Sequence, residues 1–213
     1  MGLRATRAGR RDVKETMAST EQIKTLREMT GAGIVDCREA LRMNDDSIEK
    51  ALAWLKEKGL AAAAKKSSRE ANEGVIEAYA HTGNRLAVLV EVNCETDFVA
   101  RTPEFKALAH DIALQIVATA PRFVRKDEVP AALAAEQSEH FKQEAIKEGK
   151  KPEIADRIAV GRMEKWYQDN VLMEQAFVKD DKVKIGDLVK NTVAKLGENI
   201  QIRRFVRYQL GGE

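Results

Sequence analysis

LAVLVEVNCETDFVAR, residues 86–101, is the most informative part of this sequence for its architecture. Apolar residues recur at every second position from Leu86 to Val92, which is the period of a half-buried β-strand. The alternation stops at residues 95–97 (ETD), a polar cluster suited to a turn. Pro103 then marks the start of a strongly periodic helix. The pattern predicts a strand, a turn and a helix in succession.

Phe98 falls on the connection between this strand and this helix. Large apolar residues are usually buried, so one interpretation is that Phe98 folds back into the core. Connections between regular elements also carry many binding residues, so a second interpretation is an exposed contact residue. Periodicity alone favours the first interpretation.

Residues 17–58 are predicted to form three short helices. A capping-box pattern at Ser19 begins the first helix, and the glycines of residues 30–33 (TGAG) end it. Asp46 is expected to cap the third helix, and Gly59 to end it. The predicted inward-facing residues of the second helix are Ile34, Cys37 and Leu41.

The rest of the chain predicts a sheet with helices. Residues 59–73 are expected to be a linker or a frayed helix, and residues 74–94 a β-hairpin that turns at residues 82–84 (TGN). Four helices are predicted: one from Pro103, one over residues 131–149, one over residues 152–169 and one from Ile185 to Gly197. The third of these is expected to turn Ile154, Ile158 and Met163 inward. A final strand is predicted from Ile200 to Tyr208. The fold class is therefore α+β: an N-terminal three-helix domain, then a core with a small antiparallel sheet covered by helices.

Composition excludes several classes of protein. Hydrophobic residues make up 44% of the 213 residues and charged residues 33%, a globular balance. The formal net charge is only +2, so composition does not indicate a nucleic-acid binder. No apolar run is long enough to cross a bilayer, and the two cysteines, Cys37 and Cys94, have no disulfide or metal spacing. These features predict a cytoplasmic protein with no membrane segment, metal or cofactor.

Residues 1–16 are basic and contain few large apolar residues. A transit peptide and a phosphate-binding arm are two interpretations, but acidic Asp12 and Glu15 weaken the first. The favoured interpretation is a disordered tail, or a start codon placed upstream of the true one at Met17.

No catalytic constellation is present in the sequence. It has no GxSxG, HExxH or Walker motif, and the carboxylate pairs all fit helix surfaces. The expectation is a binding protein rather than an enzyme, with no catalytic residues. One alternative is an RNA-binding or ribosome-associated module that uses the basic tail and Arg203, Arg204 and Arg207. Another is a peptide-binding protein that uses the first three helices alone.

Two segments resemble a known family in the correct order. The segment EVNCETDFVAR, residues 91–101, resembles the second signature of bacterial elongation factor Ts. The segment LREMTGAGIVDCREAL, residues 26–41, resembles that family's first signature, with Arg38 where the family usually has Lys. The resemblance runs from about Met17 to about Leu210, which is nearly the whole chain.

The resemblance implies a function and its residues. The family exchanges guanine nucleotide on the translational GTPase elongation factor Tu, and residues 17–58 would be its ubiquitin-associated-type domain. The residues that would reach the magnesium site of the GTPase are Thr96, Asp97, Phe98 and Val99. The residues that would contact its nucleotide-binding domain are Met29, Thr30, Gly31, Ala32 and Gly33. Direct binding of nucleic acid is not expected.

The chain carries one sheet domain, residues 74–213, and so resembles the short members of the family, which pair two copies through this core. A small sheet also leaves long edges and incomplete faces. Both arguments predict a homodimer, with residues 74–213 as the dimerisation domain.

Overall fold

The structure is a computed structural model that describes residues 19–212. The chain divides into two compact units, residues 1–58 and residues 59–213, and the division falls within one helix. The basic tail predicted for residues 1–16 lies outside the described residues. The described part is mixed α and β, which confirms the predicted α+β class.

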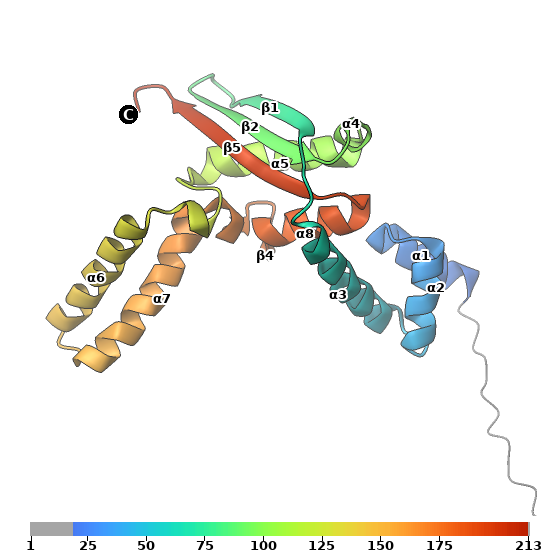
Figure 1. The fold of residues 1–213 in the computed structure, drawn as a ribbon, viewed down its shortest axis with the longest axis horizontal. Coiled ribbons are helices and arrows are strands. Elements are labelled where there is room, and N and C mark those ends of the chain that lie inside the picture. Colours follow the sequence, from blue (N-terminus) through green and yellow to red (C-terminus); the bar gives the residue numbers. More distant parts are fainter. Residues whose placement is uncertain (1–18, 213) are drawn as a thin grey trace, which may run out of the picture. The chain divides into compact units, whose positions relative to one another are not determined.

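The first unit contains α1 (Thr20–Thr30), α2 (Ile34–Met43) and the first part of α3 (Ile48–Lys66), as Figure 1 shows. The predicted capping box at Ser19 is present, because its side chain accepts from Gln22 N and the Gln22 side chain accepts from Ser19 N. The predicted cap at Asp46 is wrong. Asp46 has a φ of 57°, and Ser47 Oγ instead accepts from Lys50 N at 3.4 Å. The buried side chains of this unit are Leu26, Cys37, Ala40, Leu41, Ala51 and Leu55.

The predicted end of the third helix at Gly59 is also wrong, since α3 continues to Lys66. The segment that follows Gly59 is rich in alanine, the residue with the highest helix propensity. An added Cβ at Gly59 would lie 3.0 Å from Ala194 Cβ, so the glycine permits close packing within the second unit. Ala63 is buried in the core of that unit. The first part of the predicted linker is therefore a packed helix.

The second unit is built on a three-stranded antiparallel sheet with the order β1-β2-β5. Strands β1 (Glu73–Ala80) and β2 (Leu86–Cys94) form the predicted hairpin, and β5 (Ile200–Gln209) pairs with β2. The register between β2 and β5 shifts between Glu91 and Val92. Because β5 stands at one end of this strand order, it is an edge strand, as its arginines indicated.

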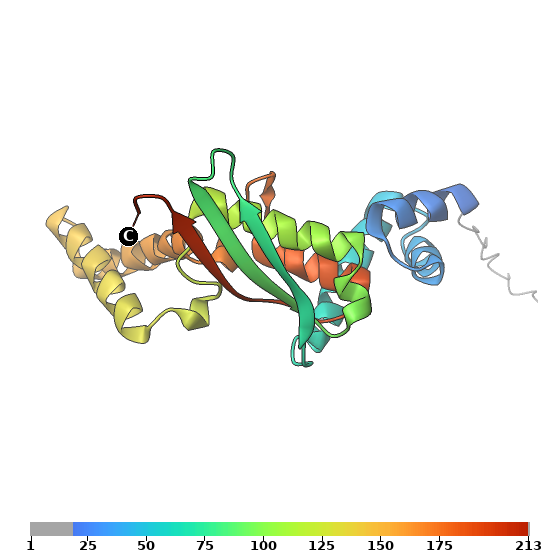
Figure 2. The same ribbon diagram turned by 90° about the horizontal axis from the view of Figure 1, so that it is seen from above.

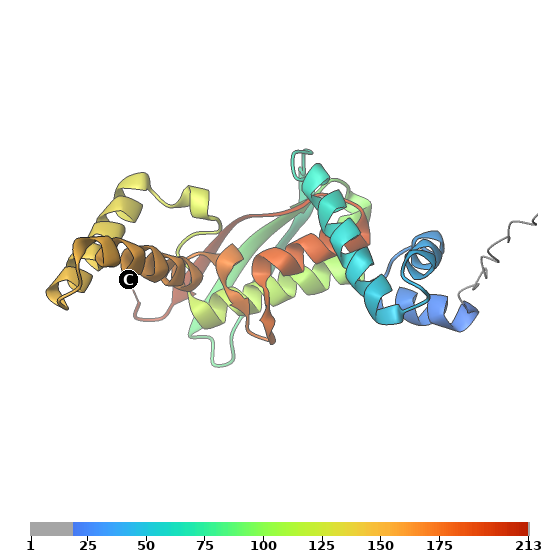
Figure 3. The ribbon, with the colours of Figure 1, turned by 90° about the horizontal axis from the view of Figure 1, so that it is seen from below.

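Two helices cover one face of this sheet: α5 (Pro103–Thr119) and α8 (Ile185–Leu196). Figure 2 shows the sheet in front of α5, and Figure 3 shows α5 and α8 on the opposite side of the sheet. The predicted alternation is confirmed, since Val88, Val90 and Val92 are buried against these helices. The largest buried side chains of α5 are Phe105, Leu108, Ile112 and Ile116.

An antiparallel pair of helices, α6 (Ala131–Lys147) and α7 (Pro152–Asn170), follows the short 3-10 helix η1 (Lys126–Glu128). Its buried residues are Ala145, Ala155, Ala159 and Met163. The prediction that Ile154 faces inward is wrong, because Ile154 is 48% exposed. The prediction that Met163 faces inward is confirmed, and the other two buried positions of α7 hold the small residues Ala155 and Ala159.

A small second hairpin was not predicted. It follows η2 (Leu172–Glu174) and consists of β3 (Ala176–Phe177) and β4 (Asp180–Lys184). The buried Gln115 side chain of α5 fastens this hairpin: its Nε2 donates to Ala176 O at 3.1 Å, and its Oε1 accepts from Val178 N at 2.8 Å. Strands this short show no alternation of apolar residues, which is why periodicity did not reveal them.

Candidate functional site

Phe98 lies on a single turn of helix, α4 (Asp97–Ala100), and its side chain is 78% exposed. The interpretation that Phe98 fills the core is therefore wrong. Its neighbours fill that role, because Ala100 is buried and Val99 packs against the main core. With these two residues turned inward, the helical turn directs Phe98 outward.

The N-terminal end of α4 is fastened by Glu198, which lies 102 positions further along the chain than Thr96. Glu198 Oε2 accepts from the backbone N–H groups of Glu95 at 3.1 Å and Thr96 at 3.0 Å. Glu198 Oε1 accepts from the Thr96 hydroxyl at 2.6 Å. Because the Thr96 hydroxyl donates its proton to Glu198, Thr96 Oγ1 is free to accept a hydrogen bond from Val99 N, at 3.4 Å. This bond caps the N-terminal end of α4.

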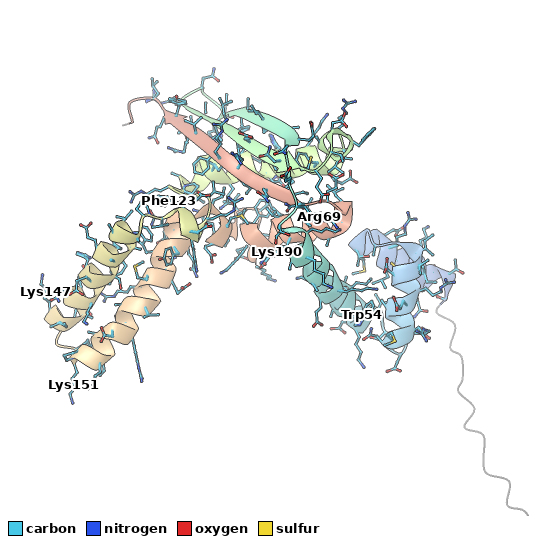
Figure 4. The ribbon with its side chains drawn as sticks, in the orientation of Figure 1. Trp54, Arg69, Phe123, Lys147, Lys151 and Lys190 are labelled. Atoms are coloured by element: carbon cyan, nitrogen blue, oxygen red, sulfur yellow. The ribbon has the colours of Figure 1, made fainter. Side chains whose placement is uncertain are left out.

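A second set of contacts surrounds Glu95. Its Oε1 accepts from the backbone N–H of the buried Asn199 at 2.6 Å, and its Oε2 pairs with Arg69 Nη1 at 3.5 Å. Asn199 Nδ2 in turn donates to Arg69 O at 2.7 Å. Figure 4 shows Arg69 beside the start of β5. The turn that carries Phe98 is thus bonded to the start of β5 and to the segment after α3.

A salt bridge and a cap secure the C-terminal end of α4. Asp97 Oδ2 pairs with Arg101 Nη2 at 2.7 Å. The Thr102 hydroxyl donates to Val99 O at 2.8 Å and accepts from Phe105 N at 3.3 Å, so that it joins α4 to α5. Of the four predicted residues in this segment, only Phe98 presents a large exposed apolar side chain.

Cys94 lies directly beneath the turn and is fully buried. Its Sγ donates to Thr96 O at 3.1 Å. Burial, with the negative charge of Glu198 as a second cause, raises the pKa of the Cys94 thiol to about 11. The thiol is therefore neutral at physiological pH, and it serves as a hydrogen-bond donor within the support of the turn.

The other predicted segment, residues 29–33, belongs to the first unit and joins α1 to α2. Gly31 ends α1 in the left-handed conformation, with a φ of 68°, and its N–H donates to Arg27 O at 2.7 Å. The Thr30 hydroxyl donates to Leu26 O at 2.7 Å and accepts from Ala32 N at 3.2 Å. Gly33 is the N-cap residue of α2. These bonds give the connection a defined backbone.

An exposed apolar patch borders this connection, and the sequence pattern did not predict all of it. Its members are Met29, which is 57% exposed, Ile34, also 57% exposed, and Val35, which is 67% exposed. The prediction that Ile34 faces inward is wrong, whereas the same prediction is confirmed for Cys37 and Leu41, which are buried. The sequence signal that could have predicted this exposure is a pair of apolar residues, Ile34 and Val35, directly after the glycine N-cap of α2.

The outward face of the three-stranded sheet carries exposed apolar residues. They are Ile76 at 68%, Leu89 at 46%, Val206 at 39% and Tyr208 at 68% exposed. Leu89 lies opposite Val206, and the next outward pair is Glu91 with Arg204, which form a salt bridge at 2.8 Å. Burial tends to raise the pKa of Glu91, but hydrogen bonds from Arg204 and Asn93 outweigh it and lower this pKa.

The arginines of β5 do not form a single basic surface. Arg204 lies opposite Glu91 on the outward face, whereas Arg207 lies opposite the inward-facing Val88. Across residues 19–212, no group of three or more His, Cys, Asp or Glu side chains could hold a metal ion. None of the helices in that range is both long and apolar enough to cross a membrane.

These features together describe an α+β protein with an N-terminal unit of three helices, an antiparallel sheet covered by helices on one face, and an exposed aromatic residue on a hydrogen-bonded turn. The family model described as Elongation factor TS matches residues 11–212. The chain belongs to the elongation factor Ts family, a family of translation elongation factors.

Similar proteins cover nearly the whole chain. Elongation factor Ts of Herpetosiphon aurantiacus is 53% identical over 193 residues, which is 91% of this chain and 98% of that protein. Elongation factor Ts of Heliobacterium modesticaldum is 51% identical over 195 residues, 92% of this chain and 91% of that protein. The protein of the same name from Thermoanaerobacter sp. is also 51% identical, over 92% of this chain and 96% of its own length.

Proposed function

We propose that this chain is a guanine nucleotide exchange factor for elongation factor Tu. The observation that carries the proposal is the exposure of Phe98, at 78%, on a turn that is hydrogen-bonded at both ends. Aromatic residues are enriched in protein–protein interfaces, and those that dominate the binding energy cluster near the centre. Family membership supplies the partner.

Phe98 acts as a wedge in this proposal. It enters the GTPase near the site that holds magnesium and the nucleotide phosphates, together with Thr96, Asp97 and Val99. A rigid aromatic side chain adds large apolar contact area and loses little conformational entropy on binding. Displacement of the magnesium removes much of the charge compensation at the phosphates, so GDP dissociates faster.

The thermodynamics of exchange follow from linkage. If the factor lowers the affinity of the GTPase for GDP, GDP lowers the affinity of the GTPase for the factor by the same ratio. The factor therefore binds best to a form of the GTPase with a disturbed phosphate site, and GTP then enters by mass action. No covalent bond forms or breaks, so no catalytic residue is assigned.

The second contact is the connection between α1 and α2. Residues 29–33 and the exposed side chains of Met29, Ile34 and Val35 offer apolar surface at the connection between α1 and α2. In the proposal, this patch holds the nucleotide-binding domain of the GTPase while Phe98 acts on the magnesium site. The ubiquitin-associated type of these three helices stays a prediction.

We also propose that the factor is a homodimer. The outward face of the sheet exposes Ile76, Leu89, Val206 and Tyr208, and no described helix covers it. Two copies related by a twofold axis could bury this face against itself, as two packed sheets do. The complex would contain two GTPase chains and two copies of the factor. Its place of action is the cytoplasm, where translation occurs.

The proposal is tested by the release of fluorescent GDP from elongation factor Tu, measured with and without the protein. Exchange activity predicts faster release that rises with protein concentration and saturates. An unchanged release rate at saturating protein would contradict it. Residues 17–58 alone are expected to be inactive, because Phe98 is absent from that fragment. Activity in the fragment would instead support peptide binding by the three helices.

A further inference from the structure

The four-residue helix that carries Phe98 is too short to hold its own orientation. Two backbone bonds of helical spacing span it, Ala100 N to Thr96 O at 3.3 Å and Arg101 N to Asp97 O at 3.2 Å. A single helical turn is unfavourable by itself, because it fixes several backbone angles for few hydrogen bonds. The direction of Phe98 therefore depends on groups outside α4.

Glu198 is the group that fixes the N-terminal end of this turn. It follows Gly197, which ends α8 with a φ of 81°, and it precedes the first residues of β5. Both of its carboxylate oxygens are used, in three hydrogen bonds to Glu95 and Thr96. Hydrogen bonds to an ionised acceptor are stronger than those between neutral groups.

We infer that Glu198 is a positioning residue for nucleotide exchange, which sets the direction of Phe98 through the hydroxyl and backbone of Thr96. The inference rests on the proposed exchange function. Glu198 itself needs no contact with the GTPase. Its three bonds fix where α4 begins, and the Thr96 hydroxyl transmits the constraint to Val99 N, in the middle of α4.

The hydrogen-bond inventory predicts what Glu198→Gln would do. A carboxylate only accepts, whereas a glutamine amide has one accepting oxygen and one donating NH₂ group. The glutamine oxygen can still serve the N–H groups of Glu95 and Thr96. Its NH₂ group would then face the Thr96 hydroxyl as a donor, so the hydroxyl loses its acceptor and no longer presents the same lone pair to Val99 N. The variant keeps the size of the side chain and disturbs the turn.

The first experiment uses the free protein and needs no GTPase. Amide hydrogen exchange is measured by NMR at the two positions that report the turn, the backbone N–H groups of Glu95 and Thr96. In Glu198→Gln these two amides are expected to exchange about tenfold faster, the effect of weakening a bond to a charged acceptor. Asp187→Asn is the matched control, since Asp187 lies on α8 and pairs with Lys190 at 3.4 Å. Unchanged exchange at both amides would overturn the inference.

The second experiment separates positioning from general stability. GDP release from elongation factor Tu is measured against factor concentration for the wild type, Glu198→Gln, Phe98→Ala and the double variant. Glu198→Gln is expected to lower the maximal release rate about tenfold, with a smaller change in the half-saturating concentration, because the contact at residues 29–33 is intact. The double variant is expected to lose clearly less than the product of the two single losses, because Glu198 acts mainly through the position of Phe98.

The outcomes are distinct. Additive losses in the double variant, or a full release rate in Glu198→Gln, would overturn the inference while the exchange function stands. Failure of the wild type to accelerate release would contradict the exchange function, and the amide experiment would then decide whether Glu198 holds the turn. If Glu198→Gln does not fold, Glu198→Asp provides the comparison, because it keeps the carboxylate but shortens the side chain by one methylene, so that the three bonds to Glu95 and Thr96 are weakened.

Discussion

Phe98 and Phe105 lie on consecutive helices and have opposite environments: Phe98 is 78% exposed, whereas Phe105 is completely buried. Thr102 joins the two helices, since its hydroxyl donates to Val99 O and accepts from Phe105 N. Phe105 therefore anchors the base from which Phe98 projects. The two residues provide a matched pair of variants for separating function from stability.

Phe98→Ala is expected to lower the rate of GDP release about tenfold or more, the size of a central interface residue. Its free energy of unfolding should change by less than about 0.5 kcal/mol, because the side chain is mostly in solvent. Phe105→Ala should lose about 3 to 5 kcal/mol of stability through the cavity that it leaves. Chemical denaturation and GDP release measure the two effects. A folded Phe98→Ala protein with full activity would contradict the wedge.

Gly74→Ala is expected to destabilise the second unit strongly. Gly74 has a φ of 145°, and an added Cβ would lie 2.1 Å from Val92 O in the neighbouring strand. Gly83→Ala is the control, because Gly83 also has a positive φ, 86°, but has no atom within 4 Å of an added Cβ. The control should lose about 1 kcal/mol. Thermal unfolding measures the stability of both variants. Equal losses of stability would contradict the prediction, because the backbone would then have shifted to avoid the contact between the new Cβ and Val92 O.

Cys94 is expected to resist alkylation by iodoacetamide at pH 8 in the folded protein, because the reactive thiolate is scarce when the pKa is about 11. Stability should fall as the pH rises above 9. The unfolded chain loses the thiol proton near its ordinary pKa of 9.0, whereas the folded chain keeps it until about pH 11. The unfolded state then binds fewer protons, so the free energy of unfolding decreases by up to about 1.4 kcal/mol per pH unit.

Denaturation of the wild type and of Cys94→Ala at several pH values isolates this contribution, since every other titrating group is shared. The variant should show a shallower decrease between pH 9 and pH 11. Identical slopes for the two proteins would mean that the Cys94 thiol does not titrate differently in the folded and unfolded states.

Leu89→Lys is expected to separate the proposed dimer into monomers. Leu89 lies on the central strand, 46% exposed on the outward face, and a lysine there would place two like charges in a self-complementary interface. Ile154→Lys is the control, because Ile154 is similarly exposed, at 48%, but lies on α7. Light scattering over a wide concentration range measures the mass. A wild-type protein that is monomeric throughout would contradict the dimer and leave the exchange function untouched.

Local patterns predicted much of the second unit correctly. The alternation of Val88, Val90 and Val92 identified the central strand, Pro103 identified the start of α5, and Gly197 the end of α8. Each of these signals acts over a few residues: strand periodicity, the fixed φ of proline, and the left-handed conformation that glycine permits. The helix end expected at Gly59 is wrong because the alanine-rich segment that follows favours helix, and because Gly59 itself permits close packing against Ala194 of α8.

In the candidate site, too, local patterns predicted some features and missed those that depend on contacts between distant residues. The motif around Phe98 predicted the segment that we propose as a contact with the GTPase, whereas periodicity favoured burial of the Phe98 side chain, which is wrong. The sequence pattern did not predict a role for Glu198, because no residue near it in the sequence indicates a contact with Thr96, 102 positions away. A carboxylate beside a helix end is common, and only the folded chain shows which amides it accepts from.

The fold class, the order of most strands and helices, the family and the segment that carries Phe98 could all be read from the amino-acid sequence. These properties depend on residue type and short-range spacing, which the chain displays directly. The outward direction of Phe98, the meeting of Glu198 with Thr96 and the open face of the sheet emerged only in the folded chain. Those relationships bring together residues far apart in sequence, and they depend on the packing of α5 and α8 against the strands.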